Sequence, residues 1–561
     1  MASVRRSSRG PLLAGMALAL LLGFGLARGL QATDDVYSQL DFFSQIFNVV
    51  QRAYVDVPDN DKLVKGAIDG MLRTLDPHTV YLPAERAEKM DEDFHGEYTG
   101  IGINFEIRDG VIVVIAPLEG TPAYRLGIRA GDRIVEIDQK PVPKTITNDD
   151  VFKQLRGKAG SLVDVSIARE GEADPLHYTI ERAKIAIESI PYAYMIRPGV
   201  GYVRIIRFAQ TTGEELEKSI DKLHEQGMKE LLIDLRYNAG GLLNQAVDVL
   251  DQLVPANKLL VYTRGRIPQA NQDYRSSDRP RIAEHLPVVV LIDHGSASAS
   301  EIVSGAIQDL DRGLVTGTNS FGKGLVQNQI ALGQPAGSKG KLLLTIAKYY
   351  TPSGRLIQRD YTKFANRDDY TEEGIAGADV PSDSALATRP KFKTAGGRVV
   401  YGGGGIYPDV VVKDPPLLTK PQVDMIAKRA FFEYATHYVN QHKDVQWSHD
   451  LLSRNFALTD ADWNELHKTM DRLKVTTLTD SVWTADRPFM LRQVRAEIAS
   501  ATLGSVERYR IAVEDDAQLN AALELFPRAT QLMAGVVDAT PKTTAKNAKP
   551  TTTTNRAGAR R

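Results

Sequence analysis

The sequence of 561 residues contains no cysteine. That absence excludes a disulfide scaffold, a thiol nucleophile, a zinc site with thiolate ligands and a lipidated cysteine anchor. An excess of charge of one sign is absent too, because 69 Lys and Arg stand against 70 Asp and Glu. Proteins that coat nucleic acid usually carry a strong basic surplus, so the composition argues against a nucleic-acid partner. The ten histidines form no zinc motif such as His-Glu-x-x-His, and we expect neither a metal nor a cofactor.

The N-terminus carries the pattern of an export signal. Arg5, Arg6 and Arg9 precede an apolar stretch at residues 11–27. A basic segment followed by a short apolar one directs a chain across a membrane. The stretch is close to the shortest length that spans a bilayer, so residues 1–33 are predicted to be a signal peptide or an inner-membrane anchor. Either alternative places the body of the protein in the periplasm or another extracytoplasmic space. A buried core helix is the remaining alternative.

Hydrophobic periodicity divides the rest of the chain into regions. Residues 36–89 repeat apolar positions at helical spacing, whereas residues 94–182 read as short strands separated by glycines. Residues 200–413 alternate strands with helices, which predicts a largely parallel sheet covered by helices. Residues 420–533 read as helical throughout. The low-complexity basic tail that follows cannot bury a core and is predicted to be disordered, its charge serving solvation or surface adhesion.

Several elements of the alternating region are predicted individually. We expect strands at 203–208, 231–235, 288–292 and 342–350, and helices at 214–226, 242–253 and 301–310. A Gly-, Asp- and Lys-rich segment at 359–405 has the composition of a large insertion or a mobile excursion.

A serine lies where chemistry is often found in such sheets. Ser-Ala-Ser-Ala-Ser-Glu occupies residues 296–301, between a predicted buried strand and a predicted helix. At such a junction side chains and helix N–H groups meet at the carboxyl edge of the sheet. Ser298 is therefore a candidate nucleophile, with the N–H groups after it stabilising an oxyanion. The alternative is a serine that only caps the helix, which spacing alone favours.

Such a serine needs a base. His294 is nearest in the sequence, but it precedes the turn, and no Gly-x-Ser-x-Gly elbow is present. A desolvated lysine is the other known partner of a nucleophilic serine, and Lys323 in Ser-Phe-Gly-Lys-Gly offers one. The alternatives are an exposed loop lysine or one that contacts phosphate. A Walker loop fails because Gly324 stands where that loop needs a hydroxyl.

These residues give the sequence a resemblance to the carboxyl-terminal processing peptidases, exported serine endopeptidases with an inserted PDZ domain and a Ser-Lys dyad. The serine motif matches at its middle serine, Ser298, and Ser-Phe-Gly-Lys-Gly-x-x-Gln matches at residues 320–327. The resemblance implies that Ser298 is the nucleophile, Lys323 the base and Gln327 the residue that orients the lysine.

Further family blocks occur in order along the chain. They are Leu-Asp-Pro-His at 75–78, Asp-Leu-Arg-Tyr-Asn-Ala-Gly-Gly at 234–241, Tyr-Tyr-Thr-Pro-Ser-Gly at 349–354 and Gly-Ile-Tyr-Pro-Asp at 405–409. The second of these blocks implies that an N–H of Gly240 or Gly241 joins that of Ala299 in an oxyanion hole.

The glycine-rich region at 94–183 resembles a PDZ domain. PDZ domains bind an extended C-terminus by strand addition and hold its carboxylate with loop N–H groups. Gly100, Ile101 and Gly102 are the predicted carboxylate loop, and Ile103 begins the predicted pairing strand. Arg156 matches a family position linked to PDZ–protease coupling, a candidate gate residue whose alternative is an ordinary surface arginine.

We therefore predict an α/β protein with a crotonase/ClpP-like ββα protease core, an inserted β-rich PDZ domain, and N-terminal and C-terminal helical regions. The predicted domains are an export segment (1–33), an N-terminal helical region (34–93), the PDZ domain (94–183), the Ser-Lys core (184–413), a C-terminal helical region (414–536) and a basic tail (537–561).

The predicted function is an exported serine endopeptidase for C-terminal processing or protein quality control. Its expected partners are polypeptides with accessible C-termini, an adaptor protein and a second copy of the chain. One alternative is a non-catalytic PDZ scaffold, which should lack Ser298, Lys323 or Gln327, although all three are present. The other is an acyl-CoA enzyme of the related crotonase fold, which leaves the PDZ region and the export signal unexplained.

Overall fold

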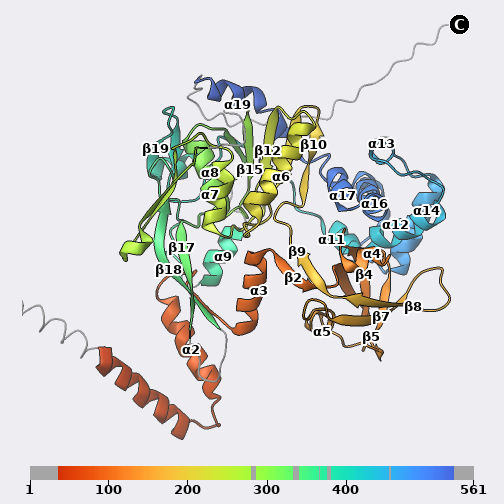
Figure 1. Cartoon of the computed structure of the whole chain (residues 1–561), viewed down its shortest axis with the longest axis horizontal. Helices are drawn as coiled ribbons and strands as arrows, with labels where there is room; N and C mark the ends of the chain where they lie inside the picture. Colours follow the sequence, from red (N-terminus) through yellow and green to blue (C-terminus); the bar gives the residue numbers. More distant parts are fainter. Residues whose placement is uncertain are drawn as a thin grey trace, which may run out of the picture. The chain divides into compact units, whose positions relative to one another are not determined.

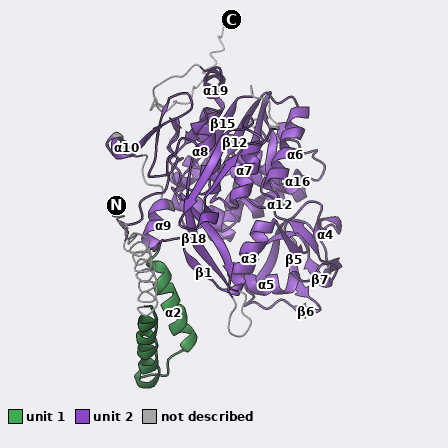
Figure 2. Cartoon of the chain, turned by 60° about the vertical axis from the view of Figure 1, so that its left-hand side comes forward, with its two compact units in different colours: residues 1–75 green, residues 76–561 purple. Residues whose placement is uncertain are grey.

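The computed structural model describes residues 36–278, 286–332, 340–364, 367–375, 381–453 and 456–535. The predicted export segment (1–33) and basic tail (537–561) lie outside these described residues. The chain forms two compact units, residues 1–75 and 76–561, which Figure 2 shows in different colours. None of the helices that the structure describes has the length and apolar content needed to cross a bilayer.

The described part of the first unit consists of two helices. Residues 36–53 form one, and α2 (Asn60–Arg73) forms the other. Asp59 caps α2, because its carboxylate accepts a hydrogen bond from the Lys62 N–H. Large apolar side chains of the first helix are exposed, among them Tyr37, Leu40, Phe42, Phe43, Ile46 and Val49. This helix thus presents an apolar surface that its own unit does not bury.

The second unit begins with a short strand that the sequence pattern does not reveal. β1 (Val80–Leu82) precedes α3 (Ala84–His95), so the helical pattern predicted over 36–89 is wrong at these three residues. β1 pairs antiparallel with β18 (Lys341–Tyr350), Val80 lying opposite Leu343. The extended conformation of these three residues depends on a partner more than 250 residues away, which local periodicity cannot report.

The predicted PDZ region is a compact β-rich body. Its sheet has the order β3-β4-β5-β7-β8, with β6 paired to β5. The elements are β3 (Ile103–Arg108), β4 (Val111–Pro117), α4 (Pro122–Arg125), β5 (Arg133–Ile137), β6 (Lys140–Pro141), α5 (Asn148–Leu155), β7 (Leu162–Ala168) and β8 (Leu176–Glu181). β2 (Glu97–Gly100) and β9 (Ala183–Ala186) pair antiparallel where the chain enters and leaves this body.

A six-stranded sheet forms the centre of the second unit (Figure 1). Its order is β10 (Tyr192–Arg197), β11 (Val200–Arg204), β12 (Glu230–Asp234), β15 (Val288–Ile292), β16 (Leu314–Gly317) and β21 (Val410–Val411). Every neighbouring pair is parallel except β10 with β11, which confirms the predicted parallel sheet. The strand predicted at 203–208 instead ends at Arg204, and the chain leaves the sheet to bring Phe208 opposite Gly241.

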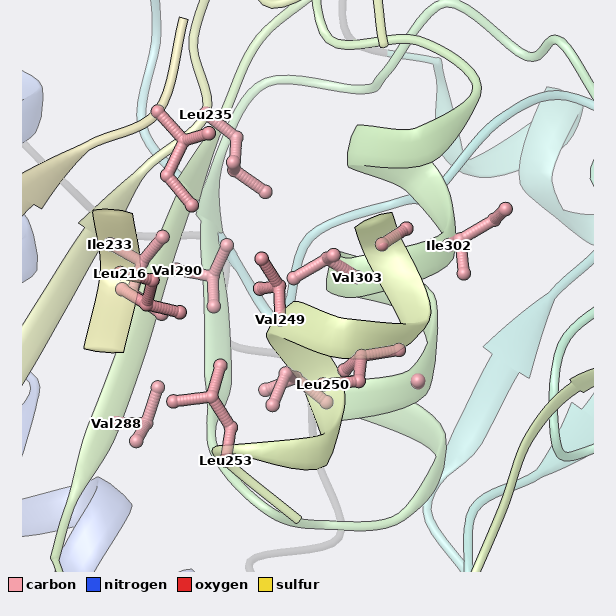
Figure 3. Close-up of a cluster of buried hydrophobic side chains, with 14 of the residues drawn as sticks. Leu216, Ile233, Leu235, Val249, Leu250, Leu253, Val288, Val290, Ile302 and Val303 are labelled. Atoms are coloured by element: carbon pink, nitrogen blue, oxygen red, sulfur yellow. The ribbon is translucent and has the colours of Figure 1, made fainter. Parts of the chain in front are cut away.

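Helices cover both faces of this sheet. α6 (Thr212–Glu225), α7 (Leu243–Asp251) and α8 (Ala299–Asp309) bury one face, where Leu216, Ile233, Val249, Val290 and Val303 meet (Figure 3). α18 (Ala517–Leu523) and α19 (Phe526–Met533) bury the other against the alternate strand residues Tyr202, Leu232, Val289 and Leu291. The end of the C-terminal helical region therefore supplies one layer of the core.

A second, antiparallel sheet packs beyond α7 and α8. It has the order β1-β18-β13-β14, and β17 (Leu325–Ala331) also pairs with β18. β13 (Leu259–Gly265) supplies Leu260 and Val261 to the core, and β14 spans Gln272–Arg275. Only β18 of this sheet was predicted. The other strands escape notice because their residues lack a clear alternation of apolar and polar positions.

The rest of the C-terminal region is helical, as predicted. α11 (Lys420–Ala427), α12 (Ala430–Gln441), α13 (His449–Leu452), α14 (Asp460–Arg472), α15 (Asp480–Ala485) and α16 (Arg487–Thr502) share a core of their own, and α17 (Ser505–Ala512) follows. This region also reaches the PDZ body, where Arg108 pairs with Glu433 at 2.6 Å and Arg429 with Glu106 at 2.9 Å.

The described parts of the segment at 359–405 pack against the core rather than project from it. They include α9 (Arg367–Ile375), α10 (Asp383–Thr388) and the hairpin of β19 (Lys391–Lys393) and β20 (Val399–Tyr401). Tyr370 is completely buried, and Arg398 pairs with Asp311 at 2.7 Å.

Candidate active site

Ser298 lies at the turn between the buried strand β15 and α8. It is the N-cap residue of α8, so it occupies the position that the capping alternative predicted. Its backbone has φ 54° and ψ −111°, a conformation that a non-glycine residue adopts only under strain. Ser298 remains partly exposed while Ala297 and Ala299 beside it are buried. The turn thus presents the serine and hides its neighbours, as a nucleophile requires.

A buried carboxylate joins the serine turn to the lysine loop. Glu301 accepts hydrogen bonds from the N–H groups of Ser298 at 2.8 Å and Lys323 at 2.9 Å, both at Oε2. Its Oε1 accepts from the Gly322 N–H at 2.7 Å and the Ser320 hydroxyl at 2.5 Å. Burial raises the pKa of Glu301, although these four donors oppose the shift. The Glu301 carboxylate therefore holds the backbone of the serine turn and the backbone of the lysine loop together.

The lysine side chain meets the predicted glutamine. Lys323 Nζ lies 2.9 Å from Gln327 Oε1, and Gln327 Nε2 donates to the backbone oxygen of His78 at 2.6 Å. Burial lowers the pKa of Lys323, against the opposing effect of the Glu301 and Asp76 carboxylates. The amine is thus oriented and shifted toward its neutral form, which a base must adopt.

Tyr349 on β18 provides a second connection between the two segments. Its hydroxyl lies 3.1 Å from the backbone oxygen of Ser298 and 2.7 Å from that of Lys323. Tyr349 is 1% exposed, so the contact is shielded from water.

The predicted oxyanion donors surround the serine. A Cβ added to Gly240 would lie 2.7 Å from the Ser298 Cβ, so a side chain cannot fit there. The Gly240 N–H already donates to Asn238 Oδ1 at 2.9 Å. Within the described residues, the N–H groups of Gly241 and Ala299 have no hydrogen-bond acceptor. Of the two glycines, Gly241 is therefore the one whose N–H is free to join that of Ala299.

His294 is turned toward a different partner. Its Nδ1 lies 3.4 Å from Asp414 Oδ2, and its ring meets Tyr237 edge-on. The neighbouring Asp414 carboxylate raises the pKa of His294. This geometry gives the histidine a carboxylate partner. Among the described residues, no group of three His, Asp or Glu could hold a metal ion.

Comparison with known proteins identifies the family. Residues 199–363 match Peptidase family S41, residues 25–86 match the activating protease CtpB N-terminal domain, and residues 113–169 match a PDZ domain. A carboxy-terminal-processing protease of Bartonella bacilliformis is 41% identical over 329 residues, which cover 58% of this chain and 74% of that protein. The chain belongs to the carboxy-terminal processing protease family.

Other members of the family are also similar. Carboxy-terminal processing protease CtpB of Bacillus subtilis is 32% identical over 338 residues, which cover 59% of this chain and 68% of that protein. Among solved structures, a photosystem II D1 C-terminal processing protease is 30% identical, with coverage of 56% of this chain and 83% of that one and a TM-score of 0.32. The predicted family, fold class and serine-type peptidase activity are confirmed.

The PDZ loop of this protease has the geometry of a backbone anion site. Gly102 has φ 82°, and a Cβ there would lie 2.3 Å from Thr121, so only glycine fits. The N–H groups of Ile101 and Gly102 have no hydrogen-bond acceptor among the described residues. Ile103 begins β3, which is the edge strand of its sheet, and Phe105 of β3 meets Phe152 of α5 edge-on.

Arg156 follows α5 and bridges to the N-terminal helices. Its Nη1 lies 2.6 Å from Glu92 of α3, and its guanidinium lies 4.6 Å from the ring centres of both Tyr98 and Phe152. The next residue of α3, Asp93, pairs with Arg207 at 3.2 Å. Helix α3 therefore touches the PDZ domain and the protease core through adjacent side chains.

Two residues of the site had no predicted role, Glu301 and Tyr349. The spacing Ser298-x-x-Glu301 is that of a capping box and contained the signal for Glu301. Tyr349 begins the family block at 349–354, but nothing in that block indicates its contacts with the backbone oxygens of Ser298 and Lys323.

Proposed function

We propose that this protease hydrolyses peptide bonds with Ser298 as nucleophile and neutral Lys323 as general base. The observation that carries the proposal is the buried contact of Lys323 Nζ with Gln327 Oε1, on a loop tied through Glu301 to the serine turn. An exposed loop lysine or a phosphate contact would need neither the burial nor the orienting amide.

The reaction then follows from the positions of these groups. Ser298 Oγ attacks the scissile carbonyl carbon while its proton passes to Lys323 Nζ. The N–H groups of Ala299 and Gly241, or Gly240 after it releases Asn238, stabilise the negative carbonyl oxygen. Protonated Lys323 gives its proton to the leaving amine, and the acyl group stays on the serine. Water attacks that ester with Lys323 again as base, which releases the acid and restores the enzyme.

We propose further that the PDZ domain binds the C-terminal end of the substrate. The free N–H groups at Ile101 and Gly102 suit a carboxylate, and β3 offers an unpaired strand edge. Arg156 would transmit binding to the core through Glu92, because α3 also contacts Arg207 by way of Asp93. The PDZ domain would act as a gate by moving between two positions on the protease. The peptide can shift that balance only if the two positions bind it with different affinity.

Two proposals concern the environment of the enzyme. The basic and apolar N-terminal residues support export to the periplasm, with residues 11–27 either removed or kept as an anchor. The exposed apolar side chains of residues 36–53 support pairing with a second copy of the chain.

One experiment tests the central proposal. The purified protease and its Ser298→Ala variant are incubated with unfolded polypeptides, and the products are identified by mass spectrometry. We expect internal cleavage by the wild type alone. Equal cleavage by a folded Ser298→Ala variant would overturn the assignment of the nucleophile.

A further inference from the structure

Tyr370 on α9 lies between the two segments that hold the Lys323–Gln327 pair. It is outside the stretch of residues 199–363 that matches the peptidase family. Its side chain is completely buried, whereas Asp368, Asp369, Glu372 and Glu373 of this helix are exposed. Such burial of one aromatic on a short polar helix indicates that the helix is held in place through that residue.

On one side Tyr370 packs against the residue whose carbonyl orients Gln327. The ring centres of Tyr370 and His78 are 5.5 Å apart at 82°, an edge-on contact. His78 keeps its backbone in place through Asp76, whose Oδ1 accepts from the His78 N–H at 2.8 Å. Arg367, one turn before Tyr370, donates to the backbone oxygen of Thr79 at 2.9 Å. Helix α9 thus packs against residues 78–79, and the backbone oxygen of His78 orients the Gln327 amide.

On the other side Tyr370 is tied to the loop that carries the lysine. Gln358 Nε2 lies 3.0 Å from the Tyr370 hydroxyl, and Gln358 Oε1 accepts from the Gly324 N–H at 2.8 Å. The Arg359 N–H donates to the Gly322 oxygen at 2.8 Å, and its guanidinium lies 4.2 Å from the centre of the Tyr370 ring. Both neighbours of Lys323 are therefore fastened to residues that Tyr370 contacts.

Two more aromatic rings contact Tyr370 and complete the cluster around it. Phe321, from the lysine loop, meets Tyr370 at 5.7 Å, and Phe364 meets it at 5.5 Å, both edge-on. Burial, together with the nearby Lys323, lowers the pKa of His78 to about 3, so its ring stays neutral at working pH.

We propose that Tyr370 is a positioning residue that keeps Lys323 dry and oriented, acting through His78–Gln327 and through Gln358–Gly324. This inference rests on the proposed role of Lys323 as base. The charged or titratable groups that face this region are Glu301 of α8, Asp76 and His78 before β1, Tyr349 of β18, and Arg359 and Arg367 beside α9. Removing the Tyr370 ring takes away its contacts with His78 and Arg359 but removes no charge, so its effect on Lys323 comes from water entry and from loss of orientation.

The test compares pH profiles of kcat and kcat/KM for the wild type, Tyr370→Phe, Tyr370→Leu and Tyr370→Ala. Water beside the Lys323 amine stabilises its charged form. The ascending limb of the pH profile, where activity rises with pH, should therefore move to higher pH by about one unit in Tyr370→Ala. The rate at neutral pH then falls about tenfold, mainly in kcat, because the neutral fraction falls by that factor. Tyr370→Phe loses the hydroxyl contact with Gln358 but keeps the ring that excludes water, so it should leave the limb in place.

Two controls keep the test decisive. Tyr370→Leu keeps apolar bulk and serves if Tyr370→Ala does not fold, and it should shift the limb in the same direction. Tyr434→Ala removes a tyrosine that is 2% exposed in the separate C-terminal core, so it costs stability without moving the limb.

The outcomes separate this inference from the function on which it rests. Full activity of Lys323→Ala would overturn the base assignment and the inference together. If Lys323→Ala is inactive but folded Tyr370→Leu and Tyr370→Ala both keep the wild-type limb, the inference alone is overturned.

Discussion

Glu301 shows how much of this site depends on single residues. One carboxylate accepts four hydrogen bonds and thereby connects the turn of Ser298 with the loop of Lys323. Since Ser298 has a positive φ, its backbone needs such outside support to stay in the exposed turn. The geometry of the dyad is therefore a property of its buried neighbours.

Replacing the serine should stop the reaction without unfolding the protein. Ser298→Ala removes the only nucleophile proposed, so peptide hydrolysis should fall about a thousandfold or more. His294→Ala should keep substantial activity, because the proposed base is Lys323. Both are measured by peptide turnover, with circular dichroism as a folding control. A folded His294→Ala variant as inactive as Ser298→Ala would assign the base to histidine instead.

The lysine predicts a pH dependence with a definite sign. A free lysine titrates near pH 10.4, and burial lowers the pKa of Lys323. Only the neutral amine accepts a proton, so activity should rise as the pH rises through the lowered pKa. Lys323→Ala should be far less active than wild type, and Gln327→Ala should lose less, because it misplaces the base without removing it. Equal rates for wild type and Lys323→Ala, across the profile, would show that another group is the base.

At the scale of elements, the loop before β3 predicts recognition of a carboxylate. A peptide with a free apolar C-terminus should bind the protease and stimulate cleavage of a second substrate. The same peptide with an amidated end should bind poorly, because the N–H groups of Ile101 and Gly102 favour a negative charge. Binding is measured by fluorescence anisotropy and stimulation by turnover of a labelled reporter.

The ion pair between Arg156 and Glu92 of α3 predicts that peptide binding and the stimulation of cleavage can be separated by mutation. Arg156→Ala removes the pair with Glu92, so it should weaken stimulation more than peptide binding. Lys153→Ala, on the same helix, is the matched control, because no ion pair of Lys153 occurs among the described residues. Stimulation of Arg156→Ala at the wild-type level would show that coupling takes another route.

The last helix predicts a contribution to stability rather than to chemistry. Phe526 at the start of α19 is completely buried against the sheet. Phe526→Ala should lower the free energy of unfolding by about 3–5 kcal/mol through the lost burial and the cavity. Gln531→Ala, exposed on the same helix, should change it by less than about 0.5 kcal/mol. Denaturant titration measures both, and similar losses would mean that α19 does not anchor the sheet.

At the scale of the whole molecule, the first unit predicts self-association. The exposed apolar side chains of residues 36–53 include Phe42 at 60% and Val49 at 63% exposure. Apolar surface of this extent is favourably buried in a symmetric pair of copies. Light scattering should show a dimer or larger assembly at micromolar concentration, and Phe42→Glu with Val49→Glu should shift it toward monomer. A wild-type monomer with and without substrate would count against assembly.

Much of the fold was predictable because its signals are local. Residues 288–292 form a continuous apolar run and become β15 within the same bounds, and the alternating order of strands and helices predicts the parallel sheet. β1 and β13 were not predictable, since their extended conformation is stabilised by pairing with β18 across long stretches of chain. Strand ends such as that of β11 depend likewise on where the next segment must turn.

By itself, the sequence determined the family and the fold class, and it indicated Ser298, Lys323 and Gln327 as the candidate site residues. Those properties follow from short motifs, each of which requires a particular side chain at a particular spacing. Only the tertiary structure decided that Glu301 joins serine and lysine, that His78 aims Gln327, and that Gly241 rather than Gly240 has a free N–H. These contacts join residues from separate elements, and burial among them lowers the pKa of Lys323. Distance and desolvation exist only once the chain has folded, so no local pattern could have reported them.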